Sequence, residues 1–257
     1  MRVKNKVAIV VGGASGIAKV TSHILSKEGA KVMIADIDIE NAEKTAEEII
    51  KSGYEAAAIK VDMTRVDDTE EMARATLEKF GKIDILVNVA GGSKGKYIRD
   101  EFGPFAESTK EMWDRIIDIN LNGARNCTRA VINHMIEQRS GKIVSMSSLA
   151  GVQGVPNAVD YSAAKAGIIG FTKALAKEVT DLGIQVNCIS PGGVATERML
   201  KFISGRKNGG VLGLDPAKMA TPEEIANIIL LLVSGEAAHL IGENIVIAGL
   251  DSHSDRI

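Results

Sequence analysis

Residues 7–20 read VAIVVGGASGIAKV, and this stretch decides the fold. Five consecutive apolar residues end at Val11, small residues follow, and a helical pattern comes next. The order of strand, glycine turn and helix is typical of a dinucleotide-binding loop. The spacing is not G-x-G-x-x-G, however, because the small residues fall at Gly12, Gly16 and Ala18. By itself the loop is compatible with a nucleotide site of another kind, a degraded site or an ordinary tight turn.

Short apolar runs alternate with longer amphipathic stretches along the whole chain. Apolar residues on consecutive positions are typical of strands that are buried on both faces. The expected strands are 7–11, 31–36, 56–61, 83–88, 141–147, 184–189 and 244–248, and the expected helices are 15–28, 40–53, 66–80, 108–138, 160–182 and 222–234. This alternation predicts one α/β domain over residues 1–257, a three-layer, doubly wound, Rossmann-like fold with a mostly parallel, seven-stranded sheet.

Composition excludes several classes of function. The 257 residues include 31 Lys and Arg against 33 Asp and Glu, which gives no electrostatic reason to expect nucleic acid or an anionic membrane as a partner. The longest strongly apolar run, 228–233, is far shorter than a membrane span. The histidines are scattered without metal-binding spacing, and the two cysteines suggest no disulfide framework. We therefore expect a cytoplasmic protein without a metal site.

Asp36 bears on the choice of cofactor. It ends the second expected strand, where a carboxylate accepts hydrogen bonds from the adenosine ribose and repels a 2′-phosphate. Neither Ser15 in the glycine loop nor Ile37 after the acid supplies a compensating cation. The sequence therefore favours NAD over NADP, and an ordinary turn at the end of a strand is the alternative interpretation of Asp36.

Tyr161 and Lys165 share one face of an expected helix, because they are four residues apart. A free phenol has a pKa of about 10, and a nearby cation favours the phenolate and lowers that pKa toward the working range. The pair is therefore a candidate for acid–base chemistry. Taken alone, the same pattern is also typical of a solvated helix face.

Five motifs occur along the chain in an order that indicates a family. They are Gly12-x-x-x-Gly16-x-Ala18, Asn88-Val89-Ala90-Gly91, Asn120-Leu121-Asn122-Gly123, Ser148 thirteen residues before Tyr161 with Lys165 four further on, and Pro191-Gly192-Gly193-Val194-Ala195-Thr196. In this order the chain resembles the short-chain dehydrogenase/reductase family over essentially its full length. The resemblance implies an NAD-dependent enzyme that interconverts a secondary alcohol and a ketone.

The resemblance also implies roles for individual residues. Tyr161 would be the general acid/base, and Ser148 would bind the substrate oxygen as charge develops on it. Lys165 would lower the pKa of Tyr161 and hold the nicotinamide ribose, and Asn120 would hold a water that relays protons to Lys165. A kinked helix is the structural alternative for Asn120, and a helix N-cap is compatible with the role of Thr196. The implied cofactor contacts are Gly12, Ser15, Gly16, Ile17, Asp36, Ile37, Asp62, Met63, Asn88, Ala90, Gly91, Tyr161, Lys165, Pro191, Gly192, Val194 and Thr196.

The chain departs from the family pattern at Val11, Ala18, Val89 and the end of the last strand, Ala248-Gly249-Leu250. The first three positions lie in or near the expected cofactor site, and the extra methyl of Ala18 is expected to weaken or shift the cofactor. These departures leave open a non-catalytic or cofactor-impaired subunit that acts as a partner or scaffold. The presence of Asn120, Ser148, Tyr161 and Lys165 favours the enzyme.

Substrate selection is expected in three loops, at 92–106, 149–160 and 192–220. Cations outnumber acids in the segments 94–99 and 197–207, where the only acid is Glu197. The cations are Lys94, Lys96, Arg99, Arg198, Lys201, Arg206 and Lys207. The hypothesis is an anionic substrate, such as a coenzyme A thioester or a carboxylate, that these cations steer. Solvated loop charges are the alternative.

Oligomerisation is implied by the resemblance only. The family usually forms tetramers, which would pack the helices expected near 108–138 and 160–182 against their symmetry mates. A hetero-oligomer with a related subunit is a further possibility.

Overall fold

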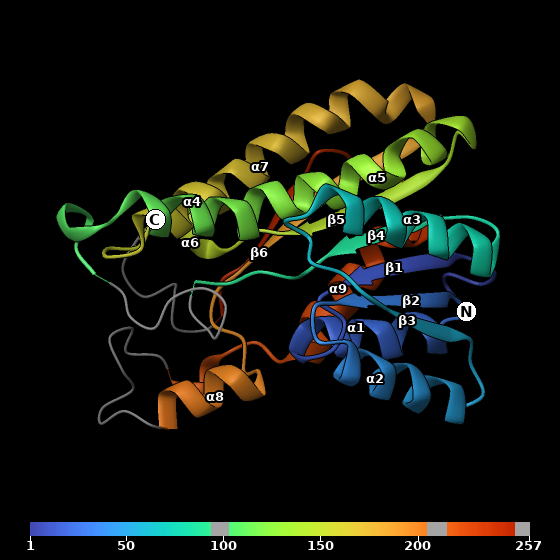
Figure 1. The fold of residues 1–257 in the computed structure, drawn as a ribbon, viewed down its shortest axis with the longest axis horizontal. Helices are drawn as coiled ribbons and strands as arrows, with labels where there is room; N and C mark the ends of the chain where they lie inside the picture. Colours follow the sequence, from blue (N-terminus) through green and yellow to red (C-terminus); the bar gives the residue numbers. More distant parts are fainter. Residues whose placement is uncertain (94–102, 205–214, 250–257) are drawn as a thin grey trace.

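One seven-stranded sheet forms the centre of the molecule. The computed structural model describes residues 1–93, 103–204 and 215–249, and every strand pairing in it is parallel, in the order β3-β2-β1-β4-β5-β6-β7 (Figure 1). The parallel, seven-stranded prediction is confirmed. The strands are β1 (Val7–Val11), β2 (Lys31–Asp36), β3 (Ala56–Lys60), β4 (Ile85–Asn88), β5 (Gly141–Met146), β6 (Ile184–Pro191) and β7 (Asn244–Ile247).

Helices cover both faces of the sheet (Figure 1). One face carries α1 (Gly16–Lys27), α2 (Ile39–Lys51) and α9 (Pro222–Val233), and the other carries α3 (Val66–Phe80), α4 (Lys110–Ile117), α5 (Gly123–Glu137) and α7 (Val159–Val179). Successive side chains of β1 point to opposite faces: Ala8 and Val10 join the apolar core under α1, whereas Ile9 and Val11 join the core under α5. Burial on both faces explains why the run at 7–11 is apolar throughout.

The strand order reverses between β1 and β4. Chain crossovers leave these two strands toward opposite sides, which opens a crevice at their carboxyl ends, where ligands bind in such folds. The backbone N–H groups of Val89 and Ala90 donate to the carbonyl oxygen of Val11 at 3.1 and 3.0 Å. The loops after β1 and β4 are thereby tied together at the crevice.

The helix expected over 108–138 is not continuous. It divides into α4, a π-helical turn η2 (Asp118–Asn122) and α5. A π turn adds one residue to the helical repeat and is often found at functional sites. The apolar pattern continues on both sides of this turn, so sequence periodicity does not reveal it. The alternative of a kinked helix at Asn120, which lies within the turn, thus agrees with the structure.

Two of the three expected substrate loops contain helices. The segment 149–160 begins with α6 (Leu149–Gln153), and 192–220 contains α8 (Glu197–Ser204). Both helices lie beyond the carboxyl ends of the strands (Figure 1). The remaining short 3₁₀ turns are η1 (Phe105–Glu107), η3 (Thr180–Leu182), η5 (Pro216–Lys218) and η6 (Gly235–Ala237).

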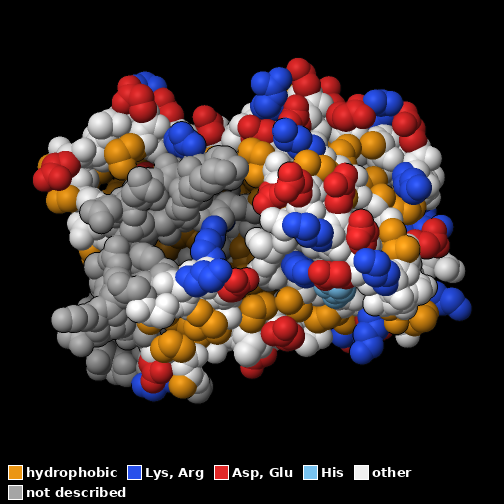
Figure 2. Space-filling view, turned by 60° about the horizontal axis from the view of Figure 1, so that its bottom comes forward, with side chains coloured by type: hydrophobic (Ala, Val, Ile, Leu, Met, Phe, Trp, Pro, Cys, Tyr) orange, Lys and Arg blue, Asp and Glu red, His pale blue; other side chains and the backbone are white. Residues whose placement is uncertain are grey.

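The described surface carries charges of both signs. Figure 2 shows acidic and basic side chains interspersed over one face, in keeping with a net charge of −2. Within the described ranges, no helix is long and apolar enough to cross a membrane.

Candidate active site

The glycine loop after β1 approaches two other loops closely. Gly12 has a φ of +85°, and a Cβ there would lie 2.9 Å from the backbone of Ala90, in the loop after β4. Gly16 has a φ of +53°, and a Cβ there would point at the side chain of Thr196, 3.4 Å away in the loop after β6. Glycine adopts such φ values without strain and leaves room for a close neighbour. The loops after β1, β4 and β6 can therefore meet at one edge of the sheet.

The first turn of α1 opens into this space. Its N-cap, Ser15, makes no side-chain hydrogen bond to the helix, and no acidic residue lies in the first turn. The first backbone N–H groups of a helix have no partner within the helix, and they attract anions. Ser15, Gly16 and Ile17 all line the adjoining cavity. The start of α1 therefore fits the pyrophosphate of a dinucleotide.

Asp36 is held firmly at the end of β2. One carboxylate oxygen accepts a hydrogen bond from the Ala14 backbone N–H at 3.0 Å, and the other accepts one from the Asp38 N–H at 3.0 Å. A carboxylate accepts about four hydrogen bonds, so it keeps capacity for a ribose. Its neighbours in the cavity lining include Ser15, Ile37 and Asp38, and none of these carries a positive charge.

Met63 and Asp62 form the next part of the same wall. A Cβ on Gly123 would lie 2.4 Å from Met63 Cε, so this glycine of α5 makes room for the Met63 side chain. The Asn126 Nδ2 donates to the Met63 carbonyl at 3.1 Å, and Asp62 Oδ1 accepts from the Thr64 backbone N–H at 3.0 Å. The segment after β3 is thereby fixed against α5.

Asn88 is placed inside the sheet and not in the cavity lining. Its Nδ2 donates to Thr128 Oγ1 at 3.2 Å and to Ser145 Oγ at 3.3 Å. The expected support of the central strand by Asn88 agrees with these bonds, whereas the expected cofactor contact falls to its neighbours Ala90 and Gly91, which do line the cavity. A side chain at the last position of a central strand points into one face of the sheet, and here α5 covers that face.

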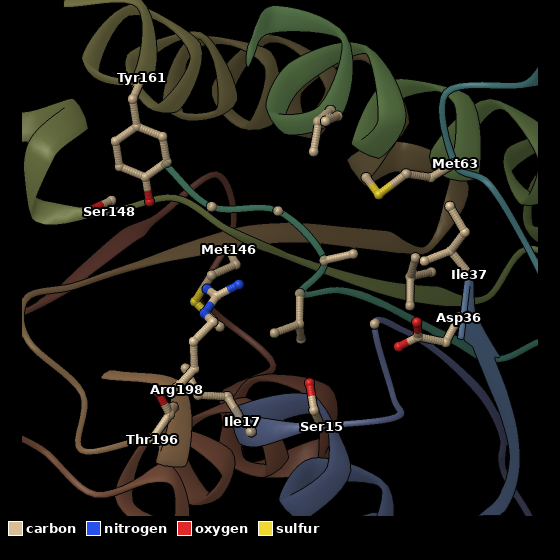
Figure 3. A pocket seen from close by; sticks show the side chains of 18 of the residues that line it. Ser15, Ile17, Asp36, Ile37, Met63, Met146, Ser148, Tyr161, Thr196 and Arg198 are labelled. Carbon is tan, nitrogen blue, oxygen red and sulfur yellow. The ribbon is translucent and has the colours of Figure 1, made fainter. Parts of the chain in front are cut away.

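Ser148, Tyr161 and Lys165 lie together at the opposite end. Ser148 caps α6 by accepting from the Ala150 N–H at 3.2 Å, and its hydroxyl is hydrogen-bonded to that of Tyr161 on α7. The Lys165 Nζ lies 5.7 Å from the centre of the Tyr161 ring and donates to the Met146 carbonyl at 2.9 Å. Figure 3 shows the two hydroxyl groups side by side.

Two nearby serines are engaged elsewhere. The Ser147 hydroxyl donates to the Lys165 carbonyl at 2.7 Å, and the Ser145 hydroxyl accepts from Asn88. Both residues are buried. Ser148 is therefore the serine whose hydroxyl meets Tyr161, at the position that the family spacing indicates.

Burial perturbs both titratable groups of this cluster. It raises the pKa of the Tyr161 phenol, while the hydrogen bond from Ser148 and the positive charge of Arg198 lower that pKa. Burial also lowers the pKa of Lys165 from 10.5 to about 8. Arg198, which sequence analysis considered as one of the cations that steer an anionic substrate, therefore also acts on the pKa of Tyr161.

The loop after β6 completes the boundary. Pro191, Gly192, Val194 and Thr196 line the cavity, and Val194 pairs with Ala220 in an isolated parallel bridge. The Thr196 hydroxyl accepts from the Met199 backbone N–H at 3.2 Å, which caps the start of α8. The predicted N-cap role of Thr196 is therefore confirmed, and it leaves the residue facing the glycine loop.

A cavity of about 1150 Å³ connects all these groups. Figure 3 shows Asp36, Ile37 and Met63 at one end and Ser148 and Tyr161 at the other. Of the expected catalytic and cofactor-binding residues, Asn88 and Asn120 do not line it, and the others do. A cavity of this volume, with an acid at one end and a phenol at the other, has room for a dinucleotide.

Sequence analysis missed the wall formed by α4. Glu111, Asp114, Arg115 and Asp118 line the cavity, and their spacing places them on one helix face. That spacing was a usable signal, but nothing in the sequence shows that this face turns toward the glycine loop. Gly13 was also missed, and a Cβ there would lie 2.7 Å from Ile34 Cγ2.

The loop cations are only partly described. Lys94, Lys96, Arg99, Arg206 and Lys207 lie outside the described residues, as does Leu250 at the end of the last strand. Arg198 and Lys201 lie on α8 and line the cavity. Lys201 forms an ion pair with Glu197 at 2.6 Å.

Comparison with known proteins agrees with this geometry. A family model described as "short chain dehydrogenase" matches residues 6–206. The chain is 34% identical over 249 residues to a 3-oxoacyl-[acyl-carrier-protein] reductase of Thermotoga maritima, covering 97% of this chain and 98% of the relative. It is 35% identical over 246 residues to an acetoacetyl-CoA reductase of Allochromatium vinosum, covering 95% and 97%.

Two further matches extend the range of related proteins. A (2S)-[(R)-hydroxy(phenyl)methyl]succinyl-CoA dehydrogenase subunit, BbsD, of Thauera aromatica is 34% identical over 256 residues, with 97% of each chain covered. A solved structure titled "Crystal structure of gox2181" superposes with a TM-score of 0.83 at 28% identity, covering 96% of this chain and 95% of that one.

Proposed function

This chain belongs to the short chain dehydrogenase family and is an oxidoreductase, and we propose that it is an NAD-dependent enzyme that interconverts a secondary alcohol and a ketone. The observation that carries the proposal is the position of Ser148, Tyr161 and Lys165 at one end of a cavity whose other end is Asp36. The dinucleotide would be held by the glycine loop, the start of α1 and the Asp36 carboxylate. Bound NAD would accept the hydride in alcohol oxidation or, in its reduced form, supply it for ketone reduction.

The chain's own residues would handle the proton. In alcohol oxidation, the Tyr161 phenolate oxygen takes the hydroxyl proton of the substrate, and in ketone reduction the phenol returns it. The Ser148 hydroxyl donates a hydrogen bond to the substrate oxygen as negative charge develops on it. Lys165 and Arg198 favour the phenolate by their positive charge, against the effect of burial.

NAD is favoured over NADP at the Asp36 end. A 2′-phosphate there would meet the Asp36 carboxylate and, close by, that of Asp38. Like charges at short distance repel strongly where water is partly excluded. The uncharged Ser15 and Ile37 supply no compensating cation.

We infer a substrate with an acyl chain and an anionic group, such as a hydroxyacyl-CoA. The names of three relatives support this class, because they include a 3-oxoacyl-[acyl-carrier-protein] reductase, an acetoacetyl-CoA reductase and a subunit of a (2S)-[(R)-hydroxy(phenyl)methyl]succinyl-CoA dehydrogenase. A homotetramer, packed through α5 and α7, is the expected assembly, and light scattering of the purified protein would test it.

The test combines binding with turnover. We expect the wild type to bind NAD more tightly than NADP by fluorescence titration, and to reduce or oxidise members of a hydroxyacyl and alcohol panel. Tyr161→Phe should retain NAD binding within about threefold and lose at least about 100-fold in kcat, the usual scale of acid–base catalysis. Tyr54→Phe, outside the cavity lining, is the matched control and should behave as the wild type.

The outcomes separate two kinds of protein. Absence of dinucleotide binding by the wild type would overturn the enzyme proposal. Binding of NAD without turnover of any panel member would instead favour a non-catalytic subunit, which the departures at Val11 and Val89 left open.

A further inference from the structure

The cations of the described cavity lining differ in whether other groups of the protein already occupy their charge. They are Arg115, Lys165, Arg198 and Lys201. Lys165 is buried behind Tyr161 and donates to the Met146 carbonyl. The Lys201 ammonium, one turn along α8 from Arg198, is paired with Glu197. Among the described residues, no carboxylate forms an ion pair with Arg198.

Arg198 extends from a well-anchored helix start. The Ala195 N–H donates to the Ala220 carbonyl at 2.8 Å, and the Ala220 N–H donates to the Gly193 carbonyl at 3.2 Å. Together with the Thr196 cap, these bonds fix where α8 begins. Arg198 is exposed and lines the cavity, and Figure 3 shows its side chain extending from α8 toward Met146.

The charge of Arg198 acts at the reacting end of the cavity. Its positive charge lowers the pKa of Tyr161 against the effect of burial. A substrate oxygen held by Ser148 and Tyr161 would therefore place the atoms next to the reacting carbon within the field of this guanidinium.

The described lining of the cavity offers no general positive field. Acidic side chains outnumber basic ones along this lining, and they lie at the adenosine end, on α4, at the start of η2 and, as Glu197, on α8. Along the described lining, attraction of an anion therefore depends on individual cations and not on a broad basic surface. A guanidinium is also suited to this task, because its planar fork binds carboxylate and phosphate oxygens in pairs.

We propose that Arg198 is the specificity-determining residue of this site, and that it binds a carboxylate or phosphate oxygen carried by the substrate beside the reacting carbon. The proposal rests on the oxidoreductase function proposed above. Of the seven loop cations of the sequence, the structure describes Arg198 and Lys201, and the proposal concerns Arg198 because Lys201 is paired with Glu197. The phosphates of the dinucleotide carry the same kind of anionic oxygen. The experiment therefore separates binding of the substrate by Arg198 from binding of the dinucleotide.

The experiment compares three variants. Arg198→Met removes the charge, Arg198→Lys keeps it without the planar fork, and Lys201→Met removes the neighbouring cation that is already paired. The probes are 3-hydroxybutyrate against its neutral methyl ester, and 3-hydroxybutyryl-CoA against the neutral N-acetylcysteamine thioester. For each pair, kcat/KM is measured together with the Kd for NAD.

Loss of a charge-assisted hydrogen-bonded pair is expected to cost about 10- to 100-fold. Arg198→Met should therefore lower kcat/KM for the anionic member of at least one pair by that factor more than for its neutral member, which loses only the part that follows from the higher pKa of Tyr161. Arg198→Lys should recover part of the loss, and Lys201→Met should change the ratio by less than about threefold. The Kd for NAD should stay within about threefold in all variants.

Three results would overturn the proposal. Equal losses for anionic and neutral probes would mean that Arg198 does not distinguish them. A parallel rise in the Kd for NAD would assign the guanidinium to the dinucleotide phosphates. An unchanged ratio in Arg198→Met would show that the residue selects nothing.

A binding measurement tests Arg198 even if the proposed oxidoreductase function is wrong. If the wild type binds NAD but turns over no probe, calorimetric titration with 3-hydroxybutyrate and 3-hydroxybutyryl-CoA still tests Arg198. Tighter binding by the wild type than by Arg198→Met, for at least one of the two, would support the assignment, and equal binding of both would reject it.

Discussion

Asn120 holds both polar groups of Gly92. The Gly92 N–H donates to Asn120 Oδ1 at 2.8 Å, and Asn120 Nδ2 donates back to the Gly92 carbonyl at 2.9 Å. The same Nδ2 also donates to the Ile116 carbonyl at 3.1 Å. Asn120 therefore joins the π turn to the loop after β4, within reach of the catalytic cluster. Its expected role in holding a water that relays protons to Lys165 stays a prediction.

Replacing Asn120 should destabilise the fold. In Asn120→Leu, the buried N–H and carbonyl groups of Gly92 lose their partners, and an unsatisfied buried polar group costs about 1–3 kcal/mol. We expect the free energy of unfolding in urea to fall by about 3 kcal/mol. Asn122→Leu, on the exposed side of the same turn, is the control and should cost less than about 0.5 kcal/mol. Equal effects of the two variants would contradict the structural role of Asn120.

Lys165→Met should stabilise the fold at neutral pH while it removes activity. Burial holds the folded-state pKa of Lys165 near 8, below the 10.5 of the unfolded chain. Below pH 8 the folded protein carries a buried charge, so the lysine opposes folding there. Stability from this group rises only between about pH 8 and 10.5, where the unfolded chain binds more protons.

The lowered pKa of Lys165 corresponds to a destabilisation of the folded state of roughly 3 kcal/mol. In the Met variant, loss of the hydrogen bond to the Met146 carbonyl offsets about 1 kcal/mol of the gain. We therefore expect Lys165→Met to be more stable than the wild type by about 2 kcal/mol at pH 7, with the difference vanishing near pH 10. Urea unfolding at both pH values measures this. A variant that is less stable at pH 7 would show that the buried ammonium is better compensated than the structure indicates.

Asp36→Asn should reduce the preference for NAD. The substitution keeps the shape of the side chain but removes the charge that repels a 2′-phosphate. We expect the ratio of the Kd for NADP to that for NAD to fall by about 10-fold, the equivalent of about 1.4 kcal/mol. Asp38→Asn removes an equal charge two residues away, where the carboxylate caps α2. A larger change in the ratio for Asp38→Asn than for Asp36→Asn would place the discrimination elsewhere.

Ala18→Gly should affect stability and not NAD affinity. Sequence analysis expected Ala18 to weaken or shift the cofactor, but the residue is buried in the core beneath α1 and does not line the cavity. Glycine in a helix costs about 1 kcal/mol relative to alanine. We expect urea unfolding to show a loss of that size and NAD titration to show a Kd within twofold. A tighter Kd in Ala18→Gly would restore the original expectation.

The amino-acid sequence by itself determined the architecture and the centre of the site. The alternation of apolar runs and amphipathic stretches predicts the parallel sheet, because strands such as β1 are buried on both faces by helices that their own sequence encodes. The sequence also predicts the centre of the site, because the spacing of Ser148, Tyr161 and Lys165 along two adjacent elements is a local property.

Only the tertiary structure decided which distant groups meet there. Asn120 reaches Gly92 across 28 residues because a π turn rotates it out of the regular helical repeat, and periodicity does not detect one added residue. The α4 wall and Arg198 are ordinary charged helix positions in the sequence. They belong to the site because the carboxyl ends of parallel strands bring the loops after β1, β4, β5 and β6 to one edge, and the direction in which each loop returns is fixed by packing over the whole molecule.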